Sequence, residues 1–267
     1  MDPVRIVSLV PSHTQSLHDL GLKDRVVGRT RFCIHPEPWV GWVPTVGGTK
    51  DAKLEKILAL EPDLVVADKD ENPKPLVDDL EAAGVEVLWS EIDTVPDAAD
   101  FLERLGERCG APTAGHVAAE RTRQALADVG GDPVAAWCPI WYDPWMTFDA
   151  TAYPSAMLAA VGIRNVFADH DGPKYFEVRP EEVAASGAAW TLLPTEPYPF
   201  HKRRDAIDLA ALGAAGTRSR IMDGEALTWF GTHTAAGLRV LHELAEQLRA
   251  ADEEPRGEHD EPQPAHG

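Results

Sequence analysis

The stretch RIVSLVPSHTQSLHDLGLKDRVVGRT, residues 5–30, decides the fold class of this chain. Its first residues are apolar and β-branched, which is the pattern of a buried strand, and VVGRT at 26–30 repeats that pattern. The residues between them favour a helix: Ser12 and Gln15 stand at the separation of a capping box, and Gly21 suits the end of a helix. A strand, a helix and a second strand in this order predict the start of a parallel α/β sheet.

The same alternation continues along the chain. KLEKILALEPDLVVA (53–67) combines a helical period with a strand, and LVDDLEAAGVEVLW (76–89) does so again. These units predict an N-terminal α/β lobe over residues 1–93.

Residues 94–130 contain no strand-like run and form a helical linker. Its main helix is predicted from Thr113, a plausible cap, to Val129, which at 1.5 Å per residue gives a rod of roughly 24 Å. The α/β rhythm resumes over 131–250, with one helix expected at about 202–212. Residues 251–267 lack apolar side chains and are expected to be a disordered acidic tail.

The expected architecture is therefore two parallel-sheet α/β lobes joined by a single long backbone helix, with a ligand cleft between the lobes. In open parallel sheets, ligands bind beyond the carboxyl ends of the strands. The segments expected there are 12–14, 29–36, 47–50, 68–72, 142–148, 196–201 and 228–233.

The chain resembles the class III substrate-binding proteins, also called helical-backbone metal receptors, over residues 4–249. The resemblance rests on the stretch quoted first, on 53–67 and 76–89, and on YPSAMLAAVGIRNVFAD (153–169) with FEVRPEEVAASGAAWTLL (176–193). This family includes the vitamin B12-binding and iron-siderophore-binding proteins of ABC importers. The resemblance implies a bilobal fold that binds a metal chelate, a free transition metal or a corrinoid between the lobes.

The chain departs from that family at four positions. The vitamin B12 binders carry tryptophans where this sequence has Thr49 and Asp68, and importer-bound members carry docking glutamates where it has Lys74 and Gly231. Because both docking carboxylates are replaced, we expect no docking to a permease.

Composition and charge limit the function further. The net charge of −19 repels phosphate backbones, which makes nucleic acid an unsuitable partner. Every apolar run is shorter than a membrane span needs, and the first residues show no leader pattern. The three cysteines are odd in number and widely spaced, as in proteins of a reducing compartment. These features predict a cytoplasmic homologue of the family.

Cys33 and His35 lie two positions apart in the loop after the second strand. In an extended loop both side chains project to the same side and face the cleft together. They either ligate a metal, with His201 and His233 as the further candidates, or act separately, Cys33 packing in the loop and His35 contacting the ligand. A closed zinc site needs about four ligands, and no CxxC or HxxxH pattern supplies the rest.

Polar candidates lie on the other loops of the N-terminal lobe. His13 falls in the first turn of a predicted helix, where an anion is attracted, or else it caps that helix. Four charged residues of these loops either bind a ligand or are simply solvated at the surface: Arg31, Lys50, Lys69 and Glu71.

Aromatic residues dominate the expected opposite wall. The densest cluster consists of Trp141, Tyr142, Trp145 and Phe148, which either stack on a planar ligand or pack the core of the C-terminal lobe. The wall is completed by Tyr198, His201, Trp229 and His233.

The sequence contains no G-x-S-x-G, P-loop or G-x-G-x-x-G motif, so catalysis has little support. The favoured hypothesis is a non-enzymatic small-molecule-binding protein of the ABC-importer substrate-binding type, whose ligand is a metal chelate or a corrinoid such as cobalamin. The alternatives are a metal-dependent enzyme on the same scaffold and a genuine importer receptor for an iron complex or cobalamin.

Overall fold

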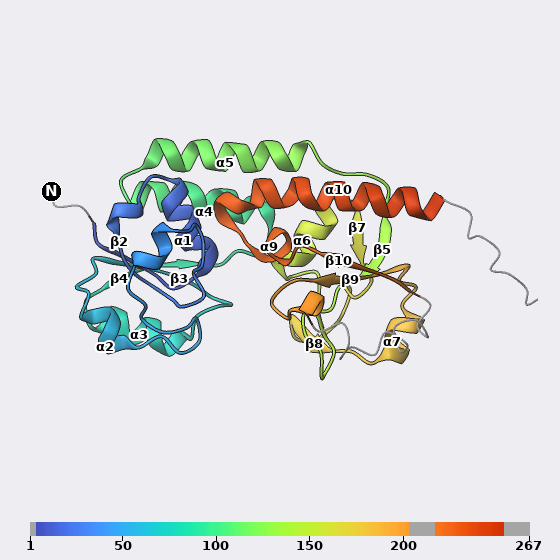
Figure 1. The fold of residues 1–267 in the computed structure, drawn as a ribbon, viewed down its shortest axis with the longest axis horizontal. Helices are drawn as coiled ribbons and strands as arrows, with labels where there is room; N and C mark the ends of the chain where they lie inside the picture. The colour runs from blue at the N-terminus through green and yellow to red at the C-terminus, as the bar shows by residue number, and fades with distance from the viewer. Residues whose placement is uncertain (1–3, 203–216, 254–267) are drawn as a thin grey trace, which may run out of the picture.

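A computed structural model describes residues 4–202 and 217–253. It contains two four-stranded sheets, one in each of two lobes (Figure 1). The N-terminal sheet has the order β2-β1-β3-β4, and all of its neighbouring strands are parallel. Its strands are β1 (Ile6–Ser8), β2 (Val26–Arg29), β3 (Leu64–Asp68) and β4 (Glu86–Ser90). The predicted parallel α/β lobe is confirmed.

The helices of this lobe are α1 (Pro11–Asp19), α2 (Leu54–Leu58) and α3 (Lys74–Ala82), with short 3-10 turns at Lys23–Arg25 and Trp39–Trp42. The predicted capping box at Ser12 and Gln15 is wrong. Helix α1 begins at Pro11, and its N-cap residue Val10 makes no side-chain hydrogen bond. Pro11 suits the first helical position because the missing N–H costs no hydrogen bond there, and Val10 has no side-chain oxygen that could accept one.

The C-terminal sheet has the order β10-β9-β5-β7 and is also parallel. Its strands are β5 (Val134–Trp137), β7 (Ile163–Asn165), β9 (Trp190–Pro194) and β10 (Arg218–Met222). Two three-residue strands that were not predicted, β6 (Met146–Phe148) and β8 (Tyr175–Glu177), pair antiparallel beside it. The lobe's helices are α6 (Tyr153–Ala160), α7 (Pro180–Ala185) and α9 (Gly224–Thr228), with 3-10 turns η3 (Phe200–Lys202) and η4 (Gly231–His233).

Three long helices cover one side of both lobes: α4 (Val95–Arg108), α5 (Pro112–Ala127) and α10 (Thr234–Glu253) (Figure 1). Helix α5 is the predicted connecting helix, although it begins one residue before Thr113. Helices α4 and α5 approach closely at Gly106 and Gly115: a Cβ on Gly115 would lie 2.6 Å from the carbonyl oxygen of Leu102. Only glycine permits that approach.

One apolar cluster crosses the junction between the lobes. It joins Leu17 of α1 and Phe101 of α4 to Met157 of α6 and to Phe230 and Leu238 from the C-terminal part of the chain. The lobes therefore share a packed core, and separating them would expose apolar surface.

Some expectations fall at or beyond the described residues. Helix α10 continues to Glu253, past the boundary drawn at 250, and residues 254–267 of the predicted tail lie outside the described part. Nearly all of the helix expected at 202–212 also lies outside it. The boundaries drawn at 93, 130 and 250 stay a prediction. None of the described helices is long and apolar enough to cross a membrane.

Candidate ligand cleft

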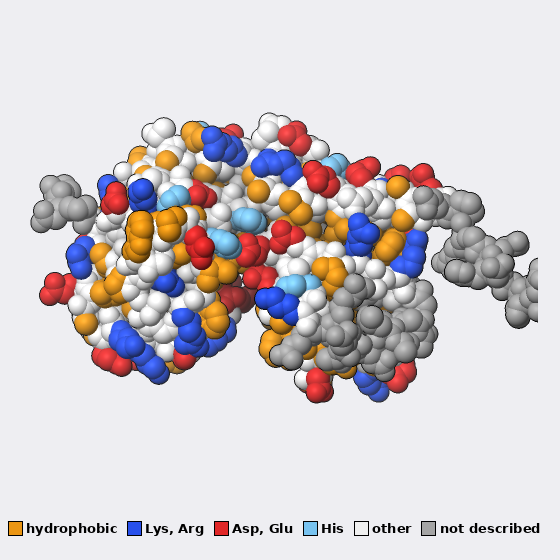
Figure 2. Space-filling view, viewed as in Figure 1, with side chains coloured by type: hydrophobic (Ala, Val, Ile, Leu, Met, Phe, Trp, Pro, Cys, Tyr) orange, Lys and Arg blue, Asp and Glu red, His pale blue; other side chains and the backbone are white. Residues whose placement is uncertain are grey.

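The carboxyl-end loops of the two sheets meet where the molecule is hollowed between its lobes, and acidic side chains and histidines gather at this junction (Figure 2). Among the described residues, polar contacts join the two lobes at several places, and two of them involve residues of the carboxyl-end loops. At one, Lys174, just before β8, points its Nζ at two carboxylates of the N-terminal lobe, at 2.9 Å from Asp70 Oδ2 and 2.6 Å from Asp93 Oδ1. The Tyr175 hydroxyl donates to the same Asp70 oxygen at 3.4 Å. This group, Lys174 with Asp70 and Asp93, is called the latch below.

The second crossing contact joins two predicted candidate regions. His35 Nε2 lies 3.2 Å from Glu225 Oε1 of α9, and both side chains are partly exposed. The rings of His35 and His233 flank the Trp229 indole, with centroid distances of 5.6 and 5.9 Å. The structure thus brings together three residues that the sequence placed in one cleft, and it adds Glu225, which the sequence did not single out.

The carboxylate of Glu196 holds the Trp229 ring of this group in place. Glu196 accepts hydrogen bonds from the Trp229 indole N–H at 2.7 Å and from the Thr228 hydroxyl at 2.8 Å. Burial raises the pKa of Glu196, and the neighbouring negative charge of Glu225 adds to that shift. Burial lowers the pKa of His233, so its imidazole favours the neutral form that can accept a hydrogen bond or ligate a metal.

The aromatic cluster of the C-terminal lobe divides into rim and core. Trp141 is 45% exposed, and its ring meets the partly buried Tyr198 edge to face at 5.3 Å. Trp145 is only 9% exposed, and it packs between Trp137 and Phe200. Trp141 and Tyr198 are therefore the rings available to a ligand, and Trp145 belongs to the core. Tyr142 is half-buried and contacts Trp145 and Tyr198.

The charged candidates of the N-terminal lobe are already engaged. Arg31 pairs with Asp51, Lys69 pairs with Glu91, and Lys50 donates to the backbone carbonyl of Asp70. Glu71 is half-buried, and burial raises its pKa against the opposing effect of Lys50. A ligand that used these side chains would have to compete with their present partners.

Cys33 and His35 do not face the same side, because the loop is not extended at Cys33. The chain turns at Cys33, whose N–H donates to the Thr30 carbonyl. The thiol is buried and contacts the hydroxyls of Thr14 at 3.0 Å and Thr30 at 3.1 Å, whereas His35 reaches toward the other lobe. Burial raises the pKa of the Cys33 thiol, which disfavours the thiolate that a metal requires.

His13 and His201 also lie away from the His35 group. His13 is fully buried, its Nε2 is bonded to the Ser90 hydroxyl, and it presents no surface to a ligand in this structure. His201 is exposed on η3 and has no hydrogen bond in the described part of the chain.

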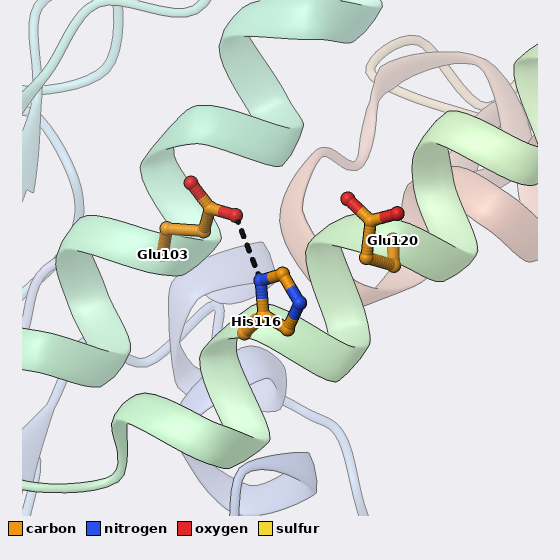
Figure 3. A group of neighbouring side chains, drawn as sticks. All are labelled: Glu103, His116 and Glu120. Atoms are coloured by element: carbon orange, nitrogen blue, oxygen red, sulfur yellow. Dashed lines mark hydrogen bonds and ion pairs between the residues drawn. The ribbon is translucent and has the colours of Figure 1, made fainter.

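Within the described residues, one group brings three metal-ligating atoms within 4.8 Å of one another: Glu103, His116 and Glu120, on the outer side of α4 and α5 (Figure 3). Arg123 donates to both glutamates, at 2.9 and 2.6 Å, and also pairs with Asp100. The guanidinium already pairs with both glutamates, so the group is an exposed ion-pair network. No group of three in the described chain includes Cys33, His35, His201 or His233.

Comparison with known proteins connects this architecture to characterised relatives. A family model described as periplasmic binding protein matches residues 6–204. The vitamin B12-binding protein of Vibrio parahaemolyticus is 30% identical over 188 residues, 68% of each chain. That of Photorhabdus laumondii is 28% identical over 176 residues, which is 64% of each chain and slightly under two-thirds of the relative's length.

Solved structures share the fold over nearly the whole chain. The periplasmic vitamin B12-binding protein of Vibrio cholerae superimposes with a TM-score of 0.80 at 23% identity, covering 92% of this chain and 97% of the other. A periplasmic heme-binding protein from Roseiflexus superimposes with a TM-score of 0.77 at 21% identity, covering 91% and 99%. At these identities the likeness establishes the fold and not the ligand.

The predicted cytoplasmic location is wrong. The matching family and the similar structures are described as periplasmic binding proteins, which points to the periplasm. The prediction rested on the missing leader pattern and on the odd number of cysteines. Neither feature is determined by the fold that the chain shares with its periplasmic relatives.

The predicted bilobal receptor fold is confirmed by the two parallel sheets, by the helices that span them and by the superpositions. The family model covers well over half of the sequence. This chain therefore belongs to the periplasmic binding protein family.

Proposed function

We propose that this chain is an importer-type receptor that holds a planar metal macrocycle, a corrinoid or a heme, between its lobes and does not transform it. The observation that carries the proposal is the similarity to relatives named vitamin B12-binding proteins at up to 30% identity. Fold neighbours named for vitamin B12 and for heme support the same ligand class.

The geometry of the cleft supports a large flat ligand. Trp141 and Tyr198 offer ring faces and edges at the rim of the C-terminal lobe, and Phe32 and Ile34 are each about half exposed beside His35. Aromatic and aliphatic side chains of this kind contribute most of the contact energy with a macrocycle. The imidazole of His35 adds a nitrogen that can contact the metal or a polar substituent of the ligand.

Contacts to a corrinoid would differ from those implied by the resemblance. Where the vitamin B12 binders carry a tryptophan, this chain has Asp68, which is only 3% exposed and cannot stack on a ligand. Thr49, at the other such position, offers no ring either. We assign the stacking contacts to Trp141 and Tyr198, with Phe32 on the other lobe as a further exposed ring.

We also propose that this chain lacks the glutamate-mediated docking to a permease, because the two docking positions are occupied by Lys74 and Gly231. Lys74 is exposed and pairs with Asp78 on the same helix. Gly231 is buried with a φ of +81°, and a Cβ there would lie 2.3 Å from Ser16 Oγ, so no side chain fits. Delivery to a permease requires contacts elsewhere.

Titration of the purified protein with hemin and with cyanocobalamin tests the ligand class. We expect one of them to bind at one molecule per chain, to shift its visible absorption band and to be released unchanged. Native mass spectrometry of freshly purified protein, with metal analysis, identifies a ligand that co-purifies. Failure of both macrocycles to bind, or chemical conversion of the bound one, would contradict the proposal.

A further inference from the structure

A fully buried hydrogen-bond chain runs through the carboxyl ends of two strands of the N-terminal lobe. The Ser90 hydroxyl at the end of β4 donates to Asp68 Oδ2 at 2.6 Å, and Asp68 ends the neighbouring strand β3. His13 Nε2 lies 2.8 Å from the same Ser90 oxygen. This set, His13–Ser90–Asp68, is called the relay below.

The proton positions in the relay follow from its chemistry. The single hydroxyl hydrogen of Ser90 goes to the carboxylate, so the Ser90 oxygen accepts from His13 Nε2–H. Burial lowers the pKa of His13 to about 3, and its imidazole is therefore neutral. Its Nδ1 has no hydrogen-bond partner in the described part of the chain. The imidazole nevertheless has a fixed place, because Phe101 stacks on it at 4.5 Å and Phe230, from the C-terminal part of the chain, packs at 5.0 Å.

The other end of the relay fixes a loop. Asp68 Oδ1 accepts the backbone N–H of Asp70 at 2.9 Å and that of Glu71 at 3.3 Å. Asn72 closes the same loop, since its side chain accepts from the Asp68 N–H and donates to the Thr49 carbonyl. Residues 68–72 are thus held by hydrogen bonds at both ends.

This loop carries one half of the latch. Asp70 receives the Lys174 ammonium from the other lobe, and Lys174 also pairs with Asp93. The Lys174 side chain is only 22% exposed, so solvent screens this contact less than it would an ordinary surface ion pair. Because Asp68 accepts hydrogen bonds from the N–H groups of Asp70 and Glu71, it fixes the backbone that directs the Asp70 side chain toward Lys174.

We propose that the relay positions the latch: it fixes the loop at 68–72 so that Asp70 meets Lys174 and the lobes stay closed. Asp68 and Ser90 then act as positioning residues for closure, through Asp70. The inference concerns lobe closure without ligand, so its failure would leave the proposed ligand class untouched.

The distance between the lobes is the decisive readout. One spin label is attached at Glu81→Cys and the other at Glu181→Cys, because both glutamates are exposed. They belong to α3 and α7, which lie on different lobes and on the side away from α5 (Figure 1). The three native cysteines are buried and leave the labels specific. Pulsed electron–electron double resonance on the ligand-free full chain then gives the distribution of distances between the two lobes.

Asp68→Ala and Asp68→Asn form the matched pair. Alanine removes the bonds to Ser90 and to both backbone amides. Asparagine keeps them, because its oxygen accepts from the amides and its NH₂ donates to Ser90. Asn165→Ala, which deletes a buried turn-capping side chain of the C-terminal lobe, controls for a general loss of stability.

We expect Lys174→Met to broaden the distribution most, because it removes both carboxylate contacts. Asp68→Ala should broaden it less, since Lys174 keeps its pair with Asp93, and Asp68→Asn and Asn165→Ala should leave it as in the parent protein. Adding Asp68→Ala to Lys174→Met should produce no further change, since Asp68 acts on closure only through the contact between Asp70 and Lys174. If Asp68→Ala does not fold, Ser90→Ala takes its place. An unchanged distribution for Lys174→Met, or an additive double variant, would overturn the proposal.

Discussion

The imidazole of His35 and the carboxylate of Glu225 meet across the cleft, with Nε2 and Oε1 3.2 Å apart although the residues are 190 positions apart in sequence. Each belongs to a different lobe, and each remains partly open to solvent. A ligand that enters between the lobes must therefore either displace this contact or lie against it.

We expect His35→Ala to weaken binding of the macrocycle by about 1–2 kcal/mol, roughly tenfold in Kd, because it removes one hydrogen bond or metal contact. Titration with hemin and cyanocobalamin measures the loss. His116→Ala is the matched control, since that imidazole is 65% exposed on the outer side of α5. Equal affinities for wild type and His35→Ala would remove His35 from the binding site.

Trp141→Ala should weaken ligand binding, whereas Trp145→Ala should destabilise the fold. Trp141 is 45% exposed, so its loss should cost binding about 1–3 kcal/mol and leave folding intact. Trp145 is buried among Trp137 and Phe200, so its loss should lower the free energy of unfolding by about 3–5 kcal/mol. Urea denaturation and ligand titration of both variants separate the two effects. A stable Trp145→Ala would show that its ring does not belong to the core.

The fold followed from the sequence because strand and helix periods are local. The apolar runs near Ile6, Val26 and Leu64 marked the positions of β1, β2 and β3 along the chain. Strands β6 and β8 were missed, since they pair antiparallel with each other and stand outside the alternation of helices and parallel strands. The start of α1 was misplaced because the capping pattern predicts a cap at Ser12, whereas the helix already begins at Pro11.

The site was only partly predictable, for reasons of tertiary packing. The sequence located Trp141 and Trp145 in one loop, but only the packed lobe decides which ring is exposed. Lys174 meets a carboxylate 104 positions away, and nothing in its local sequence marks that pairing. His13 was placed at the correct strand end, but its burial under Phe101 and Phe230 depends on α4 and the C-terminal part of the chain.

Cys33→Ser should leave the metal content per chain unchanged. The thiol is buried against the hydroxyls of Thr14 and Thr30, and a serine hydroxyl can keep those contacts. Inductively coupled plasma mass spectrometry of wild type and variant gives the comparison. Stoichiometric zinc or iron that disappears with the thiol would instead support the metal-dependent enzyme.

Ligand binding should rotate the lobes little. The apolar cluster that includes Leu17, Phe101 and Met157 is continuous across the junction, and a wide hinge motion would expose it. Small-angle scattering of the free and loaded protein should give radii of gyration equal within error. A clear decrease on loading would show that the shared core does not restrain the hinge.

Asp68→Asn should stabilise the fold at neutral pH and much less in acid. Burial is the largest cause that raises the pKa of Asp68, to about 6 from an ordinary value of 3.8. The folded protein therefore binds this proton more tightly than the unfolded chain does. The stability that this group contributes is fully present below about pH 3.8 and is lost as the pH rises through about 6.

An asparagine stays neutral and keeps the hydrogen bonds to Ser90 and the loop amides, so the variant should avoid that loss. We expect its free energy of unfolding at about pH 7.5 to exceed that of wild type by about 1–3 kcal/mol, and the two to converge near pH 4. Urea denaturation across this range gives the difference. Asp78→Asn, on the exposed face of α3, should show no comparable gain, since a surface ion pair contributes little. A variant that is less stable than wild type at neutral pH would mean that the ionised carboxylate holds the loop in a way that an amide cannot.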